Sequence, residues 1–221
     1  MPTLSPERVM SEKSLKKIGV KFAEPKQKRS KDAIKNLVEA AELLVASGDA
    51  ENLNARDLSR VSGYSLGALV QRLGKVENVF LHAIAHARER HLHAICAQAE
   101  AFDGNITTAE FATFLVDVGL HAMKNIVGPS IIRYYESRAL GRVNSLSDVH
   151  AYTDETIPTL MKMIAQDKTG TFRGLTPFEA KYLARSLFHI LERPFIESDP
   201  NAGSEEHRLM AVKFVTCMLS R

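Results

Sequence analysis

The amino-acid sequence predicts an all-α fold of about nine helices, with a three-helix unit near the N-terminus and a larger helical domain after it. Apolar residues recur at steps of three and four along most of the chain, which is the spacing of amphipathic helices. Capping residues and glycine or proline stops separate these segments, and no run of alternating polar and apolar residues indicates a strand. A chain of 221 residues is long enough to hold two unequal domains.

The first 29 residues are predicted to form a flexible basic arm, because they show little apolar periodicity apart from a short helical pattern around residues 9–18. Residues 1–31 carry nine basic and three acidic side chains, a net charge of +6, whereas the whole chain carries +3. Such a segment can lie along a polyanion, and it can equally be a solvated tail. No apolar run approaches the length of about 20 residues that spans a bilayer, so we expect a cytoplasmic protein without membrane contact.

Three short helices are predicted between residues 30 and 80, which we treat as the first domain. Each begins at a residue whose side chain can cap a helix, and each is followed by a break that contains glycine. The predicted spans are Ser30 to Gly48, Asn54 to Val61, and Ser65 to Gly74. The apolar residues expected to pack together are Leu58, Val61, Leu69 and Leu73 against Leu37, Ala41 and Leu44. This packing would fix the angle at which the third helix projects, which is the layout of a helix-turn-helix.

Six further helices are predicted in the rest of the chain. A long amphipathic segment, 76–101, links the first domain to a second one at residues 81–221. Thr107 and Thr176 each stand three residues before a glutamate, and this pattern forms a capping box at the start of a helix. Pro158 is expected to interrupt its helix about two residues earlier. The other predicted spans are 107–125, 129–140, 147–167, 177–192 and 204–219.

The three helices of the first domain also carry a family motif. The residues that form it are Ala40-Ala41-Glu42-Leu43-Leu44, Gly48, Asn54-Ala55-Arg56-Asp57-Leu58-Ser59 and Ser62-Gly63-Tyr64-Ser65-Leu66-Gly67-Ala68-Leu69. Over about residues 31–80 this order resembles the tetracycline-repressor-like (TetR) family of bacterial transcriptional regulators. The rest of the chain resembles the family in the number and length of its helices. The resemblance implies a ligand-released, homodimeric repressor that binds DNA.

The resemblance also assigns candidate DNA contacts, because the family uses the cap of its second helix, a residue two positions on and the first turns of its third helix. Carried over, these are Asn54, Arg56, Ser65, Leu66, Gly67, Ala68 and Gln71. Two usual phosphate contacts are missing, since Val70 and Val76 stand where the family has tyrosine and lysine. Arg72 and Lys75, with Arg60 nearby, can replace them or form an ordinary solvated surface. An alternative is therefore a ligand-binding or interaction protein of the same fold with a degenerate helix-turn-helix.

The second domain is rich in Phe, Tyr, Met and Leu, and a helical domain of this composition can enclose a cavity. The resemblance implies that a small apolar or amphipathic effector binds there and shifts the two DNA-reading helices of a dimer. The candidate lining residues, each of which can equally be a simple core residue, are Phe111, Phe114, Val118, His121, Tyr134, Phe172, Tyr182 and Phe188. The resemblance further implies a homodimer through helices 177–192 and 204–219, which would bind a palindromic operator.

Three histidines, His82, His86 and His93, fall on one face of the linking helix with Glu89 beside them. His82 and His86 have the i,i+4 spacing of metal ligands on a helix. That face lies opposite the apolar positions of the helix, so these side chains are expected to meet solvent. We therefore predict no metal site and no cofactor.

Two further features limit the function. The sequence has no glycine-rich phosphate loop, no nucleophile elbow and no carboxylate pair on a recognisable scaffold, so no enzymatic activity is expected. Cys96 and Cys217 lie in apolar helical segments without metal-ligand or redox spacing, and we expect both to be small core residues.

Overall fold

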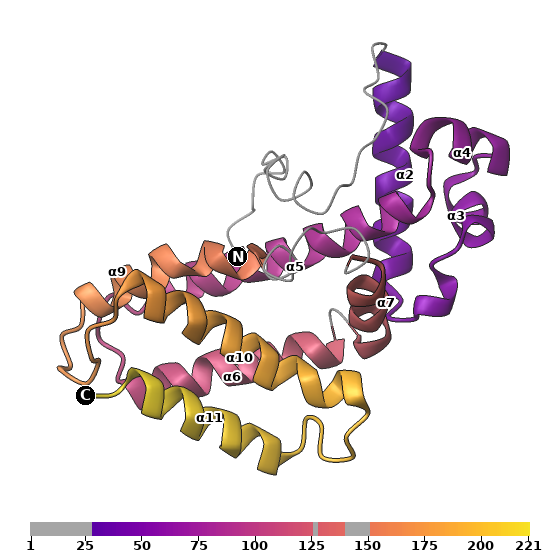
Figure 1. The fold of residues 1–221 in the computed structure, drawn as a ribbon. Coiled ribbons are helices and arrows are strands. Elements are labelled where there is room, and N and C mark those ends of the chain that lie inside the picture. The colour runs from indigo at the N-terminus through magenta and orange to yellow at the C-terminus, as the bar shows by residue number, and fades with distance from the viewer. Residues whose placement is uncertain (1–27, 126–127, 140–150) are drawn as a thin grey trace.

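The computed structural model describes residues 28–125, 128–139 and 151–221, which fold into an all-α protein (Figure 1). Within these ranges there are nine α-helices and two short 3-10 segments, and the extended pairing is limited to one isolated bridge between Phe172 and Ser220. The helices are α2 (Lys28–Ala46), α3 (Ala55–Ser62), α4 (Leu66–Leu73), α5 (Glu77–Glu100), α6 (Thr108–Asn125), α7 (Pro129–Ala139), α9 (Ile157–Ala165), α10 (Pro177–Glu197) and α11 (Glu205–Leu219), and the 3-10 segments are η1 (Ala50–Asn52) and η2 (Ala151–Thr156). The predicted fold class is confirmed. The predicted basic arm lies outside the described residues, except for its last two positions.

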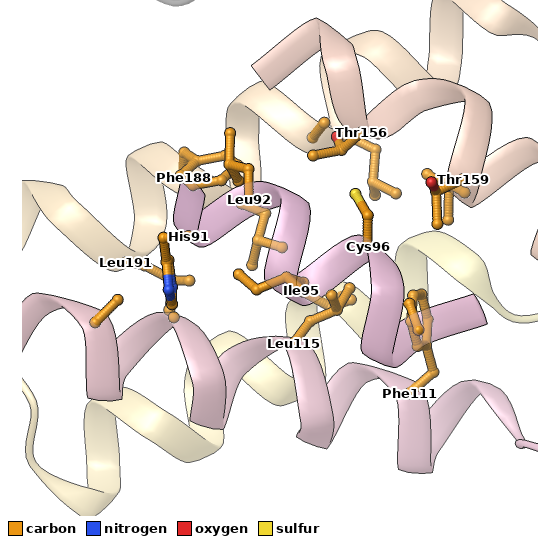
Figure 2. A pocket seen from close by; sticks show the side chains of 18 of the residues that line it. His91, Leu92, Ile95, Cys96, Phe111, Leu115, Thr156, Thr159, Phe188 and Leu191 are labelled. Atoms are coloured by element: carbon orange, nitrogen blue, oxygen red, sulfur yellow. The ribbon is translucent and has the colours of Figure 1, made fainter. Parts of the chain in front are cut away.

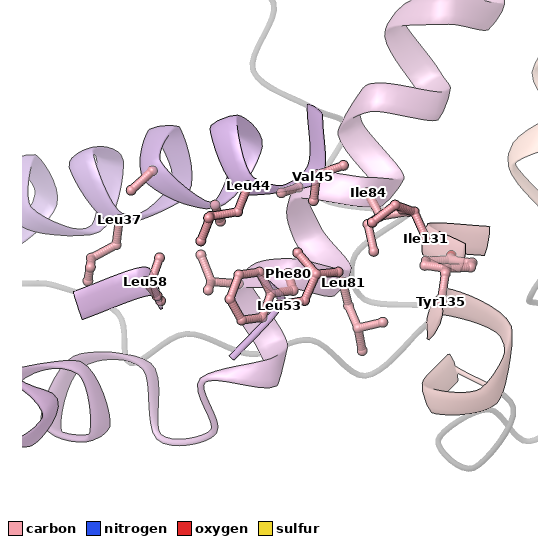
Figure 3. Packing of buried hydrophobic residues seen from close by; sticks show 14 of the residues in the cluster. Leu37, Leu44, Val45, Leu53, Leu58, Phe80, Leu81, Ile84, Ile131 and Tyr135 are labelled. Carbon is pink, nitrogen blue, oxygen red and sulfur yellow. The ribbon is translucent and has the colours of Figure 1, made fainter. Parts of the chain in front are cut away.

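Helices α2, α3 and α4 form a head at one end of the molecule (Figure 1). Leu58 of α3 is fully buried beneath α2 (Figure 3), and Leu69 and Leu73 of α4 belong to the same apolar cluster. The predicted packing of Val61 is wrong, because this side chain is 36% exposed. Val61 lies in the last turn of α3, where the chain is about to turn away towards α4.

The core of the head continues into α5 and α7. Phe80 at the start of α5 and Ile131 and Tyr135 of α7 pack in the same cluster as the head residues (Figure 3). The Ser130 hydroxyl donates a hydrogen bond to the carbonyl of Gly48 at 2.8 Å and accepts one from the N–H of Ala50 at 3.3 Å. The head is therefore packed together with α5 and α7 as one unit.

The remaining helices form a second core, which we call the body. Here α6 packs against α10 and α11, and α9 packs against α10. Its buried residues include Val116 of α6, Leu183 of α10 and Val215 of α11. Ala99, near the end of α5, lies in this second core. Helix α5 thus reaches from the first core to the second (Figure 1).

Most predicted helix starts are confirmed by their hydrogen bonds. Asn54 and Ser65 cap α3 and α4, and the Thr176 capping box at the start of α10 is complete. At the other predicted box, Thr107 and Glu110 bond to each other reciprocally. The exception is Ser30, which lies inside α2 because that helix already includes Lys28.

Pro158 and Pro194 differ in whether they interrupt a helix. The interruption near Pro158 is confirmed, since η2 ends at Thr156 and α9 starts at Ile157; residues 147–150 of that predicted span lie outside the described residues. The predicted end of α10 before Pro194 is wrong, because the helix continues to Glu197. Phe195 packs against both cores, and this burial offsets the backbone hydrogen bond that proline cannot donate.

Neither cysteine is a fully buried core residue. Cys96 is half-buried and Cys217 is exposed, because α11 turns its Cys217 side away from α6. Every helix in the described part of the chain is too short or too polar to cross a membrane.

Candidate functional site

The turn between α3 and α4 determines how α4 is presented. Gly63 has a φ of 73°, a left-handed conformation that suits glycine and reverses the chain between the helices. The Ser59 hydroxyl donates a hydrogen bond to the carbonyl of Tyr64 at 2.6 Å, which fixes the turn. Because Leu69 and Leu73 are buried, the opposite side of α4 faces outward.

The outward side of α4 contains most of the predicted DNA contacts. Ser65, Leu66, Gly67 and Gln71 are exposed, and Ala68 is half-buried. The Ser65 hydroxyl accepts the N–H of Ala68 at 3.3 Å and so caps the helix. The helix start remains accessible, as an approach to a phosphate requires.

At the start of α3, more polar side chains are engaged in hydrogen bonds within the protein than predicted, so fewer are available to DNA. The Asn54 side chain accepts the N–H groups of Arg56 and Asp57, each at 3.0 Å, and its amide donates to the Asp57 carboxylate at 2.7 Å. Arg60 also bonds to Asp57 at 2.8 Å. These contacts, led by that from Arg60, hold the pKa of Asp57 below its usual value. Arg60 is thus paired, while Arg56 is exposed at the edge of the helix.

Two further cations lie at the end of α4. The Arg72 guanidinium lies 5.3 Å from the centre of the Tyr64 ring and is half-buried. Lys75 is exposed just after the helix. Cations therefore flank the exposed face of α4, while Leu66 and Val70, at 52% and 57% exposure, occupy it one helical turn apart.

The second candidate site is a cavity in the body, lined mainly by α5, α6, α10 and the end of η2 with the start of α9, with one residue from α11 (Figure 2). Its volume is about 90 Å³, and its walls are almost entirely apolar. Two of the predicted lining residues, Phe111 and Phe188, do line it. None of the α5 wall, which includes Leu92, Ile95 and Cys96, was predicted.

The other six predicted residues lie elsewhere. Phe114, Val118 and His121 follow a neighbouring stripe of α6, beside the stripe that lines the cavity. Phe172 packs its ring against Phe111, with centroids 5.8 Å apart, in the core beneath the cavity. Tyr134 packs edge-on against Phe80 in the head core. Tyr182 is exposed and packs on the ring of Phe178.

His91 is the polar feature of the cavity that sequence reasoning missed. Its ring projects from α5 toward α6 in Figure 2. The Nε2 atom is buried and has no hydrogen-bond partner among the described residues. Burial lowers the pKa of His91, so the neutral imidazole is favoured. A ligand in the cavity could therefore meet the Nε2 atom of His91 in mostly apolar surroundings.

A buried ion pair connects the cavity to the head. Glu192 lines the cavity and accepts a hydrogen bond from Arg88 of α5, and both side chains are buried. The Arg88 guanidinium lies 5.6 Å from the centre of the Tyr135 ring, which belongs to the head core. The chain therefore has a continuous set of contacts from the cavity to α7.

The sequence predicted that the histidine face of α5 meets solvent, but most of this face is covered. Glu89 is buried and His82 is mostly buried, while His86 bonds to Glu42 of α2. The pKa of His82 is lowered to about 4, mainly by burial. The prediction failed because α2 and η2 both pack on α5, on sides that its own periodicity does not reveal. Only His93 is as exposed as expected.

The surface of α10 and α11 carries exposed apolar side chains. The two helices pack side by side (Figure 1). Their exposed large apolar residues are Phe178, Tyr182, Leu209 and Met210. Exposed apolar side chains on neighbouring helices are typical of an interaction surface.

Comparison with solved structures identifies the fold. A structure from Mesorhizobium loti, described as a TetR-family transcriptional regulator, is 12% identical, with a TM-score of 0.54 over 88% of this chain and 100% of its own. A TetR-family member from Streptomyces coelicolor is 16% identical, with a TM-score of 0.55 over 86% of this chain and 99% of its own. Neither a protein-family model nor a curated protein sequence matches the chain. The chain thus has the fold of these TetR-family transcriptional regulators.

Proposed function

We propose that this chain is a DNA-binding transcriptional regulator whose α4 enters the major groove. The observation that carries the proposal is the exposed, Ser65-capped start of α4 on a helix whose other side is locked into the head core. A helix held in this way can approach base edges with its N-terminal residues.

The exposed side chains of α4 favour A·T base pairs. Gln71 can donate to and accept from the major-groove edge of adenine, and Leu66 and Val70 can contact the methyl group of thymine. Arg56 and Lys75 can contact phosphates on either side, which adds affinity without sequence information. We infer an operator half-site that contains A·T pairs.

DNA binding is tested by fluorescence anisotropy with the full chain and the DNA that flanks its own gene, over a series of salt concentrations. Arg56→Ala and Lys75→Ala should each reduce the slope of log K against log salt by about 1. Gln71→Ala should relax base preference and leave the slope unchanged. Lys168→Ala, in the loop after α9 at the far end of the body, is the matched control (Figure 1). Equal slopes in all variants would contradict the proposal.

The basic arm is part of the same proposal. Deletion of residues 1–27 should lower DNA affinity and flatten the salt dependence, because these residues carry six basic and three acidic side chains and so a net charge of +3. An unchanged slope would show that the arm does not contact DNA.

The regulation that we propose is release from DNA by a small ligand in the cavity. A cavity of about 90 Å³ is smaller than the roughly 150 Å³ that holds benzene in other proteins. A larger effector must therefore move the cavity walls, and this gives it different affinities for two conformations. Movement at Glu192 can reach the head through Arg88 and Tyr135.

The polar atom of His91 defines a test with two probes. Phenol and benzene have similar shapes, but the phenol hydroxyl can donate a hydrogen bond to Nε2 of neutral His91. Phenol should bind the full chain more tightly than benzene in a thermal-shift titration, and the difference should vanish in His91→Leu. Equal binding of both probes to the unaltered chain would contradict this role of His91.

We also propose a homodimer through the exposed apolar face of α10 and α11, which would match a palindromic operator. Tyr182→Glu should shift the chain to a monomer in analytical ultracentrifugation. Leu43→Glu, at an exposed apolar position on α2, is the control that should stay dimeric. A dimer that survives Tyr182→Glu together with Leu209→Glu would contradict this interface.

One observation favours a second candidate, an interaction protein with a degenerate helix-turn-helix. Val61, Leu66 and Val70 expose apolar side chains on the head, as protein-binding surfaces often do. Absence of DNA binding by the full chain at low salt would support this alternative.

A further inference from the structure

The contact between α5 and η2 brings three side chains with metal-binding chemistry together. The ligand atoms of Glu89, His93 and Glu155 all lie within 4.8 Å of one another. Glu89 and His93 are one turn apart on α5 and share a face. His93 Nε2 lies 3.2 Å from Glu155 Oε2, across 62 positions of sequence.

Glu89 provides the independent sign that this cluster has a ligand. Glu89 is only 7% exposed, and its Oε2 atom is buried without a hydrogen-bond partner among the described residues. A buried carboxylate oxygen is normally satisfied by a donor or a cation. A cation between Glu89, His93 and Glu155 would supply the missing partner and reduce the repulsion between the two carboxylates.

The donor set selects the kind of ion. Ca²⁺ takes six to eight oxygen ligands and Mg²⁺ prefers an octahedron of oxygens, whereas one imidazole with two carboxylates suits a first-row transition ion. Zinc binds nitrogen and oxygen ligands at about 2.0–2.2 Å, so its ligand atoms in a tetrahedron lie about 3.3 Å apart. The pair of His93 and Glu155 already has this separation. The His93 side chain is 60% exposed, which leaves room for adjustment and for ion entry.

We propose that Glu89, His93 and Glu155 form a binding site for a divalent transition ion of the zinc type, with water in the fourth position. The ion would tie η2 to α5. Leu92 and Thr156, the sequence neighbours of His93 and Glu155, line the cavity. The site therefore controls the position of two cavity walls, and it does not depend on whether the chain binds DNA.

The test uses the full chain without an affinity tag, first treated with chelator and then titrated with Zn²⁺ in a calorimeter. We expect one ion per chain and a higher melting temperature, because an ion that binds only the folded chain stabilises it. Glu89→Gln and His93→Asn should each weaken Zn²⁺ binding tenfold or more. His93→Asn changes an exposed side chain, so it keeps the test valid if Glu89→Gln folds poorly. Glu100→Gln, a carboxylate elsewhere on α5, and His189→Asn, an exposed histidine on α10, should retain the affinity.

Co²⁺ gives a second measurement, since its visible spectrum reports the atoms that coordinate it. The spectrum should indicate nitrogen and oxygen ligands and should change in His93→Asn. The proposal is overturned if neither Zn²⁺ nor Co²⁺ binds with one-to-one saturation. It is also overturned if binding survives both Glu89→Gln and His93→Asn, because the ion would then lie elsewhere.

Discussion

The polar contacts inside the head and those inside the body differ in how far apart in sequence their partners lie. Within α3 and α4 of the head, the polar contacts are local: Asn54 and Ser65 cap helices within three residues of themselves, and Gly63 sets the turn. In the body, ion pairs join residues that are far apart in sequence, such as Arg208 with Asp117. The central example, Arg88 with Glu192, spans 104 positions and is buried.

The free-energy cost of losing a polar contact differs between these two kinds of interaction. A lost cap exposes backbone groups that water can satisfy, so the cost is small. A lost partner in a buried ion pair leaves a charge that water cannot reach, so the cost is large. The body should therefore be more sensitive than the head to single polar substitutions.

The largest effect is expected for Arg88→Met, which leaves the Glu192 carboxylate buried without its partner. The free energy of unfolding should fall by about 3–5 kcal/mol in urea denaturation. In the double variant Arg88→Met with Glu192→Leu, both charges are gone, and stability should return to that of the unaltered chain or exceed it. A single variant that costs less than about 1 kcal/mol would show that water reaches this pair.

A large apolar effect is expected in the head from Leu58→Ala. Leu58 is fully buried under α2, so its truncation should cost about 2–5 kcal/mol. Val61→Ala, one turn along the same helix, is the matched control and should cost well under half as much, because Val61 is partly exposed. Equal losses from the two variants would place Val61 in the core after all.

The junction between head and body gives a pH-dependent prediction. Burial lowers the pKa of His82 from 6.5 to about 4, whereas the unfolded chain binds the proton near pH 6.5. Between these values the unfolded state binds more protons, so stability is complete above about pH 6.5 and falls as the pH drops towards 4. The loss should reach at most about 3 kcal/mol. His82→Gln should flatten the dependence of unfolding free energy on pH in this window, and an unchanged dependence would assign it to other groups.

The local character of the head explains why sequence reasoning located it so well. Both ends of α4 and the start of α3 follow from caps and glycines within the segment itself. Where a helix end depends on distant packing, the same reasoning failed, as when α10 continued through Pro194 because Phe195 packs against both cores.

The cavity and the histidine face could not be predicted in this way, because each is assembled from distant helices. Sequence reasoning chose Phe114 and Val118 on α6, one stripe away from the stripe that meets α5 and α10. It also placed Glu89 in solvent, since the periodicity of α5 cannot indicate that η2 will cover that side. His91 had a weak signal, because it precedes the apolar Leu92 and Ile95 on one side of the helix.

The smallest effect is expected for substitutions of Asn54, the cap of α3. These substitutions also distinguish a structural role of Asn54 from a role in DNA binding. Asn54→Ala should destabilise the chain by about 1 kcal/mol, because two N–H groups at the start of α3 lose their acceptor. Asn54→Ser keeps a capping hydroxyl, so its stability should stay within a few tenths of a kcal/mol of the unaltered chain. If Asn54 acts only as a cap, DNA affinity should follow stability, and Asn54→Ser should bind like the unaltered chain. A stable Asn54→Ser variant with weakened DNA binding would instead mean that the amide leaves its cap to contact DNA.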